Sequence, residues 1–414
     1  MCLVSKLALA LALVPPLRAA PPAPAPAPAP APESAALLLP LSSSSAAAIP
    51  PELLALPRAP LDRTRAPSRI AFGSCSNQRR EQPIWDDVVS PRAPDLFVFL
   101  GDIVYADKAV FLKLRLPGSP ADVAAAYATQ LRDHAGYRRL VAAVPQLGVY
   151  DDHDTGVNDA DRHVREDWRR AAQRLLLDFL GVAPEDARRG HEGAYSAETL
   201  GRAGGGEGGG VMQVVLLDNR FARDRYETWL GPVALPLLAR QRPQDMLGEA
   251  QWAFLETELA RGAPGGAAPA DVLLIGSGLQ FVSANDPWVA ESWSKLPQSR
   301  ARLLALLALH NRSRTVLLSG DVHFGEISRT RCAFLGYPLY DATSSGLTHS
   351  WGGNLKRAVI GWSMLAATRV TEAAASAEAR SWIGGRGWTN SLNVGGMYPR
   401  QFPAHRPEPP ANSP

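Results

Sequence analysis

Seven short apolar runs recur along the chain from about Ser68 onward, and polar or helical segments separate them. Each run is about as long as a strand and apolar nearly throughout, which is typical of strands covered on both faces. They are RIAFGSC (69–75), DLFVFLGD (95–102), QLGVYDDHD (146–154), MQVVLLDNR (212–220), DVLLIGSG (271–278), TVLLSGDVHF (315–324) and LYDATSSG (339–346). The pattern therefore predicts a strand in each run.

Three intervening segments have apolar residues three and four positions apart, the spacing of amphipathic helices. These segments cover 119–144, 247–260 and 299–311. The first opens with Ser119 as a helix N-cap, Pro120 at the first helical position and Asp122 in the first turn. By contrast, 201–210 is too rich in glycine for a regular element and predicts a loop. Strands that alternate with helices predict an α/β domain.

Polar side chains follow the apolar runs at the points where the predicted strands end. In open α/β folds, ligands bind beyond the carboxyl ends of the strands. The residues concerned are Cys75, Asp102, Asp151, Asp152, His153, Asp154, Asp218, Asn219, Asp321 and His323. Because five strand ends each supply a carboxylate, imidazole or thiol, we expect them to form one shared site.

The segment DDHD, 151–154, is the densest part of this set. Neighbouring carboxylates raise one another's pKa unless a cation holds them. Two metal ions a few ångström apart would turn this repulsion into ligation, and such a centre suits phosphoryl transfer. His153 could then protonate a leaving group. The alternative is an acidic loop that caps a helix and exposes its histidine.

Two other short spacings favour metal ligation. Asp102 lies directly behind an apolar run with Tyr105 three residues on, so a carboxylate and a phenolate can reach neighbouring ions. Asp321 and His323 are two residues apart, and alternate side chains of an extended segment point the same way. The alternatives are an aspartate that caps a turn beside a packed tyrosine, and a chance Asp-x-His spacing.

Several enzyme classes lack their motifs in this chain. A cysteine-phosphatase loop needs arginine six positions after Cys75, where the chain has Glu81. The segment ATSSG, 342–346, lacks the first glycine of a serine-hydrolase elbow. The chain has no Walker A or G-x-G-x-x-G motif, and it has too few cysteines for zinc-finger spacing.

Length and composition narrow the picture further. With 414 residues and 46% apolar content, the chain is long enough for two domains or one large one. The net charge is only +3, and no basic run or basic–aromatic pattern indicates nucleic-acid binding. The mature chain would keep Cys75 and Cys332, which an exported protein can leave free or join as a disulfide.

The N-terminal region predicts export. Residues 1–20 combine Lys6, a short apolar run and small residues, as a signal peptide does, although an ordinary apolar N-terminus is the alternative. Residues 21–66 are rich in proline and alanine and predict a disordered linker. No later run reaches eighteen apolar residues, so we expect no transmembrane segment. We place the folded domain at 67–400 and a disordered tail at 401–414.

The motifs FGSCSNQ, PDLFVFLGDIVYAD, DDHDTGVNDA, LGEAQWAFLETEL and LLSGDVHFGEI occur in this order. Together they resemble the alkaline phosphatase D (PhoD-like) family of calcineurin-like metallophosphoesterases, over about 68–347. The resemblance implies a four-layer α/β/β/α sandwich with a dinuclear metal centre at the strand ends. It also implies attack of water on a phosphate-ester substrate at that centre.

The resemblance also implies roles for single residues. Cys75 stands where the family supplies a thiolate to an iron ion, Asp102 matches the bridging aspartate, and Tyr105 matches a tyrosinate ligand. Asp152 occupies an asparagine ligand position, and His153 faces the substrate. The remaining matched residues are Asp321 and His323 as ligands. We expect Asp151 and Asp154, which the resemblance does not assign, to orient their neighbours. Such a donor set favours Fe³⁺ with Ca²⁺, while Zn²⁺ or Mn²⁺ also remain compatible with it.

This chain departs from the wider family in two places. No histidine occurs in 276–281, where a further metal ligand is expected, and Ser277 or Gln280 would have to replace it. The closing Asn-aromatic-Gly motif appears only as Asn393-Val394-Gly395, and 350–392 matches no familiar motif.

Arg220 and Arg223 are candidate contacts to the substrate phosphate, with helix-surface arginines as the alternative. Phosphodiesterase activity on the same scaffold, or an inactive metal- or phosphate-binding relative, are the rival functions.

Overall fold

The computed structural model describes residues 47–89, 93–111, 114–201, 210–226, 244–283, 291–331 and 335–350. Its strands form two main sheets and a hairpin. The small sheet has the order β1-β2-β5 and is parallel, with strands Ile70–Gly73, Leu96–Leu100 and Gln146–Val149. The hairpin pairs β3 (Lys108–Phe111) with β4 (Leu114–Leu116) in antiparallel fashion.

The large sheet has six strands in the order β10-β11-β9-β8-β7-β6. Its central strands β11, β9, β8 and β7 run parallel, while the edge strands β10 and β6 are antiparallel. In the same order the bounds are Gly325–Arg331, Pro338–Ser344, Thr315–Ser319, Val272–Ser277, Met212–Leu217 and Ser196–Leu200. All seven strands predicted from the apolar runs are therefore confirmed, and β3, β4, β6 and β10 add to them.

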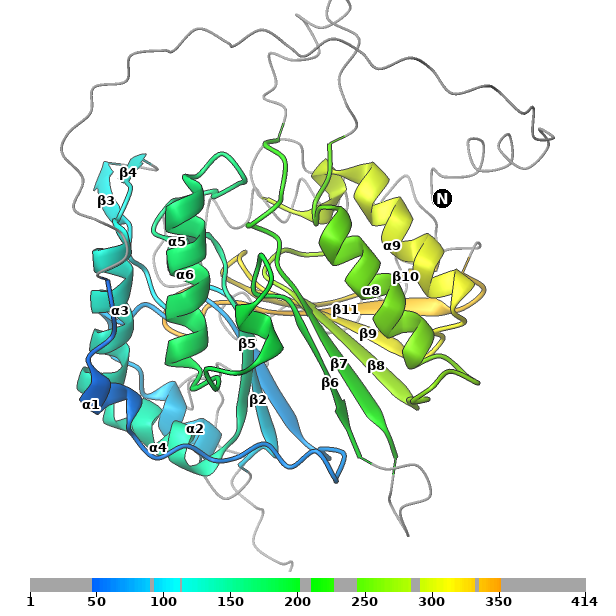
Figure 1. Ribbon diagram of the computed structural model, residues 1–414, viewed down its shortest axis with the longest axis horizontal. Coiled ribbons are helices and arrows are strands. Elements are labelled where there is room, and N and C mark those ends of the chain that lie inside the picture. Colours follow the sequence, from blue (N-terminus) through cyan, green and yellow to red (C-terminus); the bar gives the residue numbers. More distant parts are fainter. Residues whose placement is uncertain are drawn as a thin grey trace, which may run out of the picture.

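Helices cover the outer faces of both sheets (Figure 1). On the side of the small sheet lie α2 (Ile84–Val89), α3 (Pro120–Asp133), α4 (Ala135–Ala143) and α6 (Glu166–Phe179). Two helices lie on the large sheet, α8 (Glu249–Arg261) and α9 (Pro297–Leu309), and the short α1 (Pro51–Leu54) and α5 (Asp152–Thr155) complete the set of α-helices in the described ranges. The expected α/β class is confirmed, and Figure 1 shows helices on the outer side of each sheet.

The alternation of side chains along the large sheet explains why it is covered twice. On β7, Val214 and Leu216 join the core shared with the small sheet, whereas Val215 and Leu217 pack in the core beneath α8 and α9. Successive strand residues point to opposite faces, so an apolar strand needs a layer on each side. Gly276 marks how close the sheets come, because a Cβ there would lie 2.8 Å from Leu100 of β2.

Two predicted boundaries differ from the structure. The single helix expected over 119–144 is two helices, because His134 has an extended backbone and its Nε2 lies 2.8 Å from the carbonyl oxygen of Gln78. The linker expected over 21–66 does not include 47–66, where Ile49 is buried in the core and Arg63 binds Glu198. The predicted signal peptide, the tail at 401–414 and Asn393–Gly395 lie outside the described residues.

The start of α3 was predicted correctly. Ser119 Oγ accepts a hydrogen bond from the backbone N–H of Asp122, whose carboxylate accepts one from the backbone N–H of Ser119. We expect Ser119→Ala to lower the free energy of unfolding by about 1 kcal/mol, because it leaves the backbone N–H of Asp122 without its side-chain partner. Urea denaturation measures this. Thr129→Ala in the same helix is the control. An equal loss of unfolding free energy in that variant would show that the N-cap is not the cause.

No helix among the described residues is long and apolar enough to cross a membrane.

Candidate metal centre

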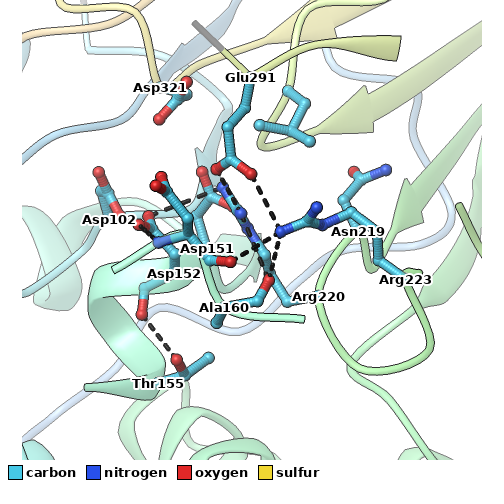
Figure 2. A network of polar contacts seen from close by, with 12 residues as sticks. Asp102, Asp151, Asp152, Thr155, Ala160, Asn219, Arg220, Arg223, Glu291 and Asp321 are labelled. Carbon is cyan, nitrogen blue, oxygen red and sulfur yellow. Dashed lines mark hydrogen bonds and ion pairs between the residues drawn. The ribbon is translucent and has the colours of Figure 1, made fainter. Parts of the chain in front are cut away.

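The ends of strands from both sheets meet at one place. An isolated parallel bridge pairs Ser74, which follows β1, with Ser345, which follows β11. Asp102 comes two residues after β2, Asp151 two after β5, and Asp321 two after β9. The carboxyl edges of the small and large sheets therefore supply the same site. Figure 2 shows Asp102, Asp151, Asp152 and Asp321 gathered there.

The backbone of this site is strained. Six non-glycine residues in the described ranges have positive φ, and four of them are predicted ligands, Cys75 (61°), Asp102 (49°), Asp321 (68°) and His323 (59°). Positive φ is uncommon for such residues and costs on the order of 1–3 kcal/mol each. Strain of this kind persists where the surrounding fold holds it in place and is frequent at functional sites. The other two residues with positive φ are Asp159 and Asn311, and the predicted ligands Tyr105 and Asp152 do not have it.

Cys75, Asp102 and His323 form the first group of possible ligands. Their donor atoms all lie within 4.8 Å of one another. The Sγ atom of Cys75 is 3.4 Å from Asp102 Oδ2, and the Tyr105 hydroxyl is 3.1 Å from the same oxygen and 3.3 Å from His323 Nε2. Ser345 Oγ accepts from the backbone N–H of His323 and touches Cys75 Sγ. A thiol, a phenol, an imidazole and a carboxylate thus converge.

A second group is built from oxygens alone. One carboxylate oxygen from each of Asp102, Asp151, Asp152 and Asp321 lies within 4.8 Å of the others. Asp102 and Asp152 also form a cluster with His153. Asp102 belongs to both the thiol-containing group and this oxygen group, which is the position expected of a ligand shared by two ions.

Burial raises the pKa values of Cys75, Asp102 and Asp321, whereas at Asp152 burial is outweighed by the charges of His153 and Arg220, which lower its pKa. Burial raises the pKa of the Cys75 thiol to about 12, with the nearby charge of Asp321 adding to the effect. Burial and the charge of Cys75 raise the pKa of Asp102 well above its usual range, and burial with Asp151 does so for Asp321. The anionic forms therefore need cations beside them. Clustered carboxylates with one thiol fit metal ions of the hard and borderline classes.

The imidazole of His153 forms an ion pair with Asp107, a residue that was not predicted from the sequence to belong to the site. Its Nδ1 lies 2.9 Å from Oδ1 of the fully buried Asp107, whose Oδ2 accepts a hydrogen bond from Arg115 at 2.8 Å. Burial opposes a charge on His153, but Asp152 and Asp107 outweigh it and raise its pKa. Asp107 ends the motif GDIVYAD, so its place beyond Asp102 and Tyr105 was the only available signal.

The two outer aspartates of DDHD differ in their surroundings. Asp154 accepts hydrogen bonds from the backbone N–H groups of Asp151, Ile103 and Val104, and so joins the loops after β2 and β5. It lies in none of the possible metal groups found among the described residues. Asp151 does lie in one, and its Oδ1 also accepts a hydrogen bond from Arg220.

Arg220 and Arg223 are deeply buried rather than exposed on a helix. Both form ion pairs with Glu291, and Arg220 also pairs with Asp151 (Figure 2). The residues Asp152, Asp159 and Glu291 form a further group whose donor atoms lie within 4.8 Å of one another. Sequence reasoning did not single out Asp159 or Glu291, because both lie in loops rather than directly behind a strand.

The segment 276–281 approaches the site by its backbone. Ser277 Oγ donates to Asn219 and Gln280 donates to Thr343, so both proposed replacement ligands have partners elsewhere. At Gly278 a Cβ would lie 2.6 Å from the carboxyl carbon of Asp151. Gly278 thus packs directly against a site carboxylate.

We expect Gly278→Ala to displace Asp151, because the added methyl group meets the carboxylate. Overpacking of this kind costs about 1–3 kcal/mol, and metal content should fall with it. Urea denaturation and elemental analysis measure both. Gly190→Ala is the control, since its nearest atom would be 3.5 Å away. An unchanged metal content in Gly278→Ala would contradict the placement of Asp151.

Cys75 is a free, buried cysteine, which does not agree with the alternative of a disulfide. Its possible partner, Cys332, lies outside the described residues, as does 351–392.

Comparisons with known proteins identify relatives of this fold. A family model described as PhoD-like phosphatase matches residues 70–347. The solved structure of PhoD aligns with a TM-score of 0.52 at 17% identity, over 70% of this chain and 58% of PhoD. The chain thus spans under two thirds of that protein's length. A structure of GAP50, the anchor in the inner membrane complex of Plasmodium, aligns at 10% identity over 69% of this chain and 73% of its own, with a TM-score of 0.37.

No curated protein matches the chain significantly. The family model nevertheless covers well over half of the chain and includes every residue of the site described above. The solved structure of PhoD supports the same α/β fold. The chain belongs to the PhoD-like phosphatase family.

Proposed function

We propose that the protein hydrolyses phosphate esters at a centre of two metal ions. The observation that carries this is the position of Asp102, which belongs to a group with Cys75 and His323 and to a group with Asp152 and Asp321. Two-metal centres suit phosphoryl transfer because they can hold both the attacking and the leaving oxygen.

We assign the residues to the two ions by the chemistry of their donor atoms. Cys75, Tyr105 and His323 would hold one ion, for which Fe³⁺ is our choice because a phenolate and a thiolate suit it. Asp152 and Asp321 would hold the other, for which Ca²⁺ is our choice because its ligands are oxygens. When bound, the ions supply positive charge for the phosphate oxygens and lower the pKa of water. Zn²⁺ and Mn²⁺ are the alternatives that elemental analysis decides.

The residues of the chain divide the remaining work. His153 donates a proton to the leaving oxygen, and Asp107 holds its Nδ1 so that Nε2 is the atom left to act. Asp154 fixes the short helix α5, which carries both Asp152 and His153, through its three hydrogen bonds from backbone N–H groups. The ring of Tyr105, whose centroid lies 4.2 Å from that of His153 in a tilted arrangement, restricts the imidazole further.

Elemental analysis of the purified protein beside a panel of phosphate esters tests the function. We expect bound metal and turnover that a chelator removes and added metal restores. Comparing bis- and mono-nitrophenyl phosphate separates phosphodiesterase from phosphomonoesterase activity. Bound metal without turnover of any ester would indicate a binding protein instead.

Export is part of the same proposal, supported by the signal-peptide pattern of residues 1–20. N-terminal sequencing of protein from a secreting host should find a mature end near residue 20. A retained Met1 would contradict export.

A further inference from the structure

Arg220 is the most deeply engaged cation near the site. Its side chain is 1% exposed, its Nε donates to Asp151 Oδ1, and its Nη1 lies 2.5 Å from Glu291 Oε2. Its Nη2 is 3.7 Å from Asp152 Oδ1. Figure 2 shows the guanidinium between these carboxylates. A single arginine therefore neutralises part of the acidic cluster from within the fold.

The chain directs Arg220 to this place by a tight turn after β7. Asp218 Oδ1 accepts hydrogen bonds from the backbone N–H groups of Arg220, at 2.8 Å, and Phe221, at 2.9 Å. Arg223 supports the same region, since its Nη2 lies 3.0 Å from Glu291 Oε1 and donates to the carbonyl oxygens of Asp159 and Ala160. The turn after β7 and the ion pairs with Glu291 thus hold the Arg220 guanidinium in one buried position.

Asp152, Asp159 and Glu291 have the proximity of a third metal site. Two of these three carboxylates already face arginine, because Glu291 pairs with both guanidinium groups and Asp152 lies within reach of Arg220. Arginine keeps its charge at every accessible pH and binds carboxylates in a planar fork. A divalent ion at this group would have to lie beside a fixed positive charge.

We propose that Arg220 is a built-in cation that replaces a third metal ion in the Asp152–Asp159–Glu291 group. Metal ions then bind only in the two groups that share Asp102. The inference rests on the proposed function, because it assumes that those two groups bind metal. It gives Arg220 a role distinct from a contact to substrate phosphate, and one that follows from its burial against three carboxylates.

The test counts metal ions per chain in the purified protein, by elemental analysis after saturation with Ca²⁺ and removal of the unbound ion. Arg220→Gln should bind one more Ca²⁺ per chain than the natural protein, because it removes the positive charge beside Asp152 Oδ1 and Glu291 Oε2, while Glu291 Oε1 stays paired with Arg223. Arg220→Lys keeps the charge and should leave the count unchanged. The double variant Arg220→Gln, Glu291→Gln should lose the extra ion. Arg312→Gln, which removes a buried arginine outside this cluster, is the matched control and should not change the count.

A folded Arg220→Gln protein with the natural count overturns the inference. If the Arg220→Gln variant fails to fold, the number of metal ions bound by the single variant Glu291→Gln tests the inference instead. An unchanged count supports the inference, whereas loss of one ion shows that Glu291 holds a metal despite Arg220 and overturns it. The count does not depend on turnover. If the natural protein binds no metal, the proposed function is overturned as well. If the natural protein binds its metal ions, only the inference about Arg220 fails.

Discussion

Asp102→Ala should remove both the bound metal and the phosphatase activity. Asp102 is fully buried, and it is the carboxylate that the thiol-containing group and the oxygen group share. Its removal would deprive both ions of a ligand at once. Substitution of outer partners of metal ligands already costs about 10–100-fold in affinity or activity, so we expect a loss of more than about 100-fold here.

The measurement is kcat/KM for a nitrophenyl phosphate together with the metal content of the same sample. A decline in both, with the fold preserved by circular dichroism, is the expected result. Asp341→Asn is a matched control, since Asp341 is an equally buried aspartate that accepts hydrogen bonds from Ser319 and from two backbone N–H groups. It should lower stability without removing metal. Full activity in a metal-depleted Asp102→Ala protein would exclude metal-dependent hydrolysis at this centre.

The strands were predictable where they are apolar on both faces. All seven such runs are strands, and β2, β8 and β9 are buried nearly throughout, as strands between two layers are. The edge strand β6 was missed because only its first and last residues, Ser196 and Leu200, are buried, so it has no apolar run. The edge strand β10, with the sequence GEISRTR, was missed for the same lack of apolar residues. Helix α6 was not among the predicted helices, although its apolar residues have helical spacing and the pattern could have been recognised in the sequence.

The candidate site divides in the same way. Cys75, Asp102, Asp152 and Asp321 follow strands within a few residues, so a strand prediction places them at one edge. Asp107, Asp159 and Glu291 lie on loops whose path depends on packing between distant segments. The burial of Arg220 likewise depends on Glu291, which is 71 residues away in the chain. The local sequence pattern cannot predict an ion pair between residues so far apart in the chain.

His153→Ala should reduce hydrolysis of alkyl phosphates far more than that of 4-nitrophenyl phosphate. A poor leaving group needs a proton as it departs, whereas nitrophenolate leaves without one, so only the first reaction uses the imidazole. We expect a loss of about 10²–10⁴-fold in kcat/KM for the alkyl ester, the range of general acid catalysis, and a much smaller loss for the nitrophenyl ester. Metal content should stay near that of the natural protein.

Asp107→Asn should show the same dependence on the leaving group at a smaller size, about 10–100-fold for the alkyl ester, as for outer partners of histidines at metal sites. The reason is that Asp107 acts only through Nδ1 of His153, 2.9 Å away. The pair of the exposed His163 and the buried Asp161, with Nδ1 and Oδ1 3.0 Å apart, is the matched control, and His163→Ala should change neither reaction. A purely structural role for Asp107 would lower both rates equally, and that result would exclude it as the residue that positions the proton donor.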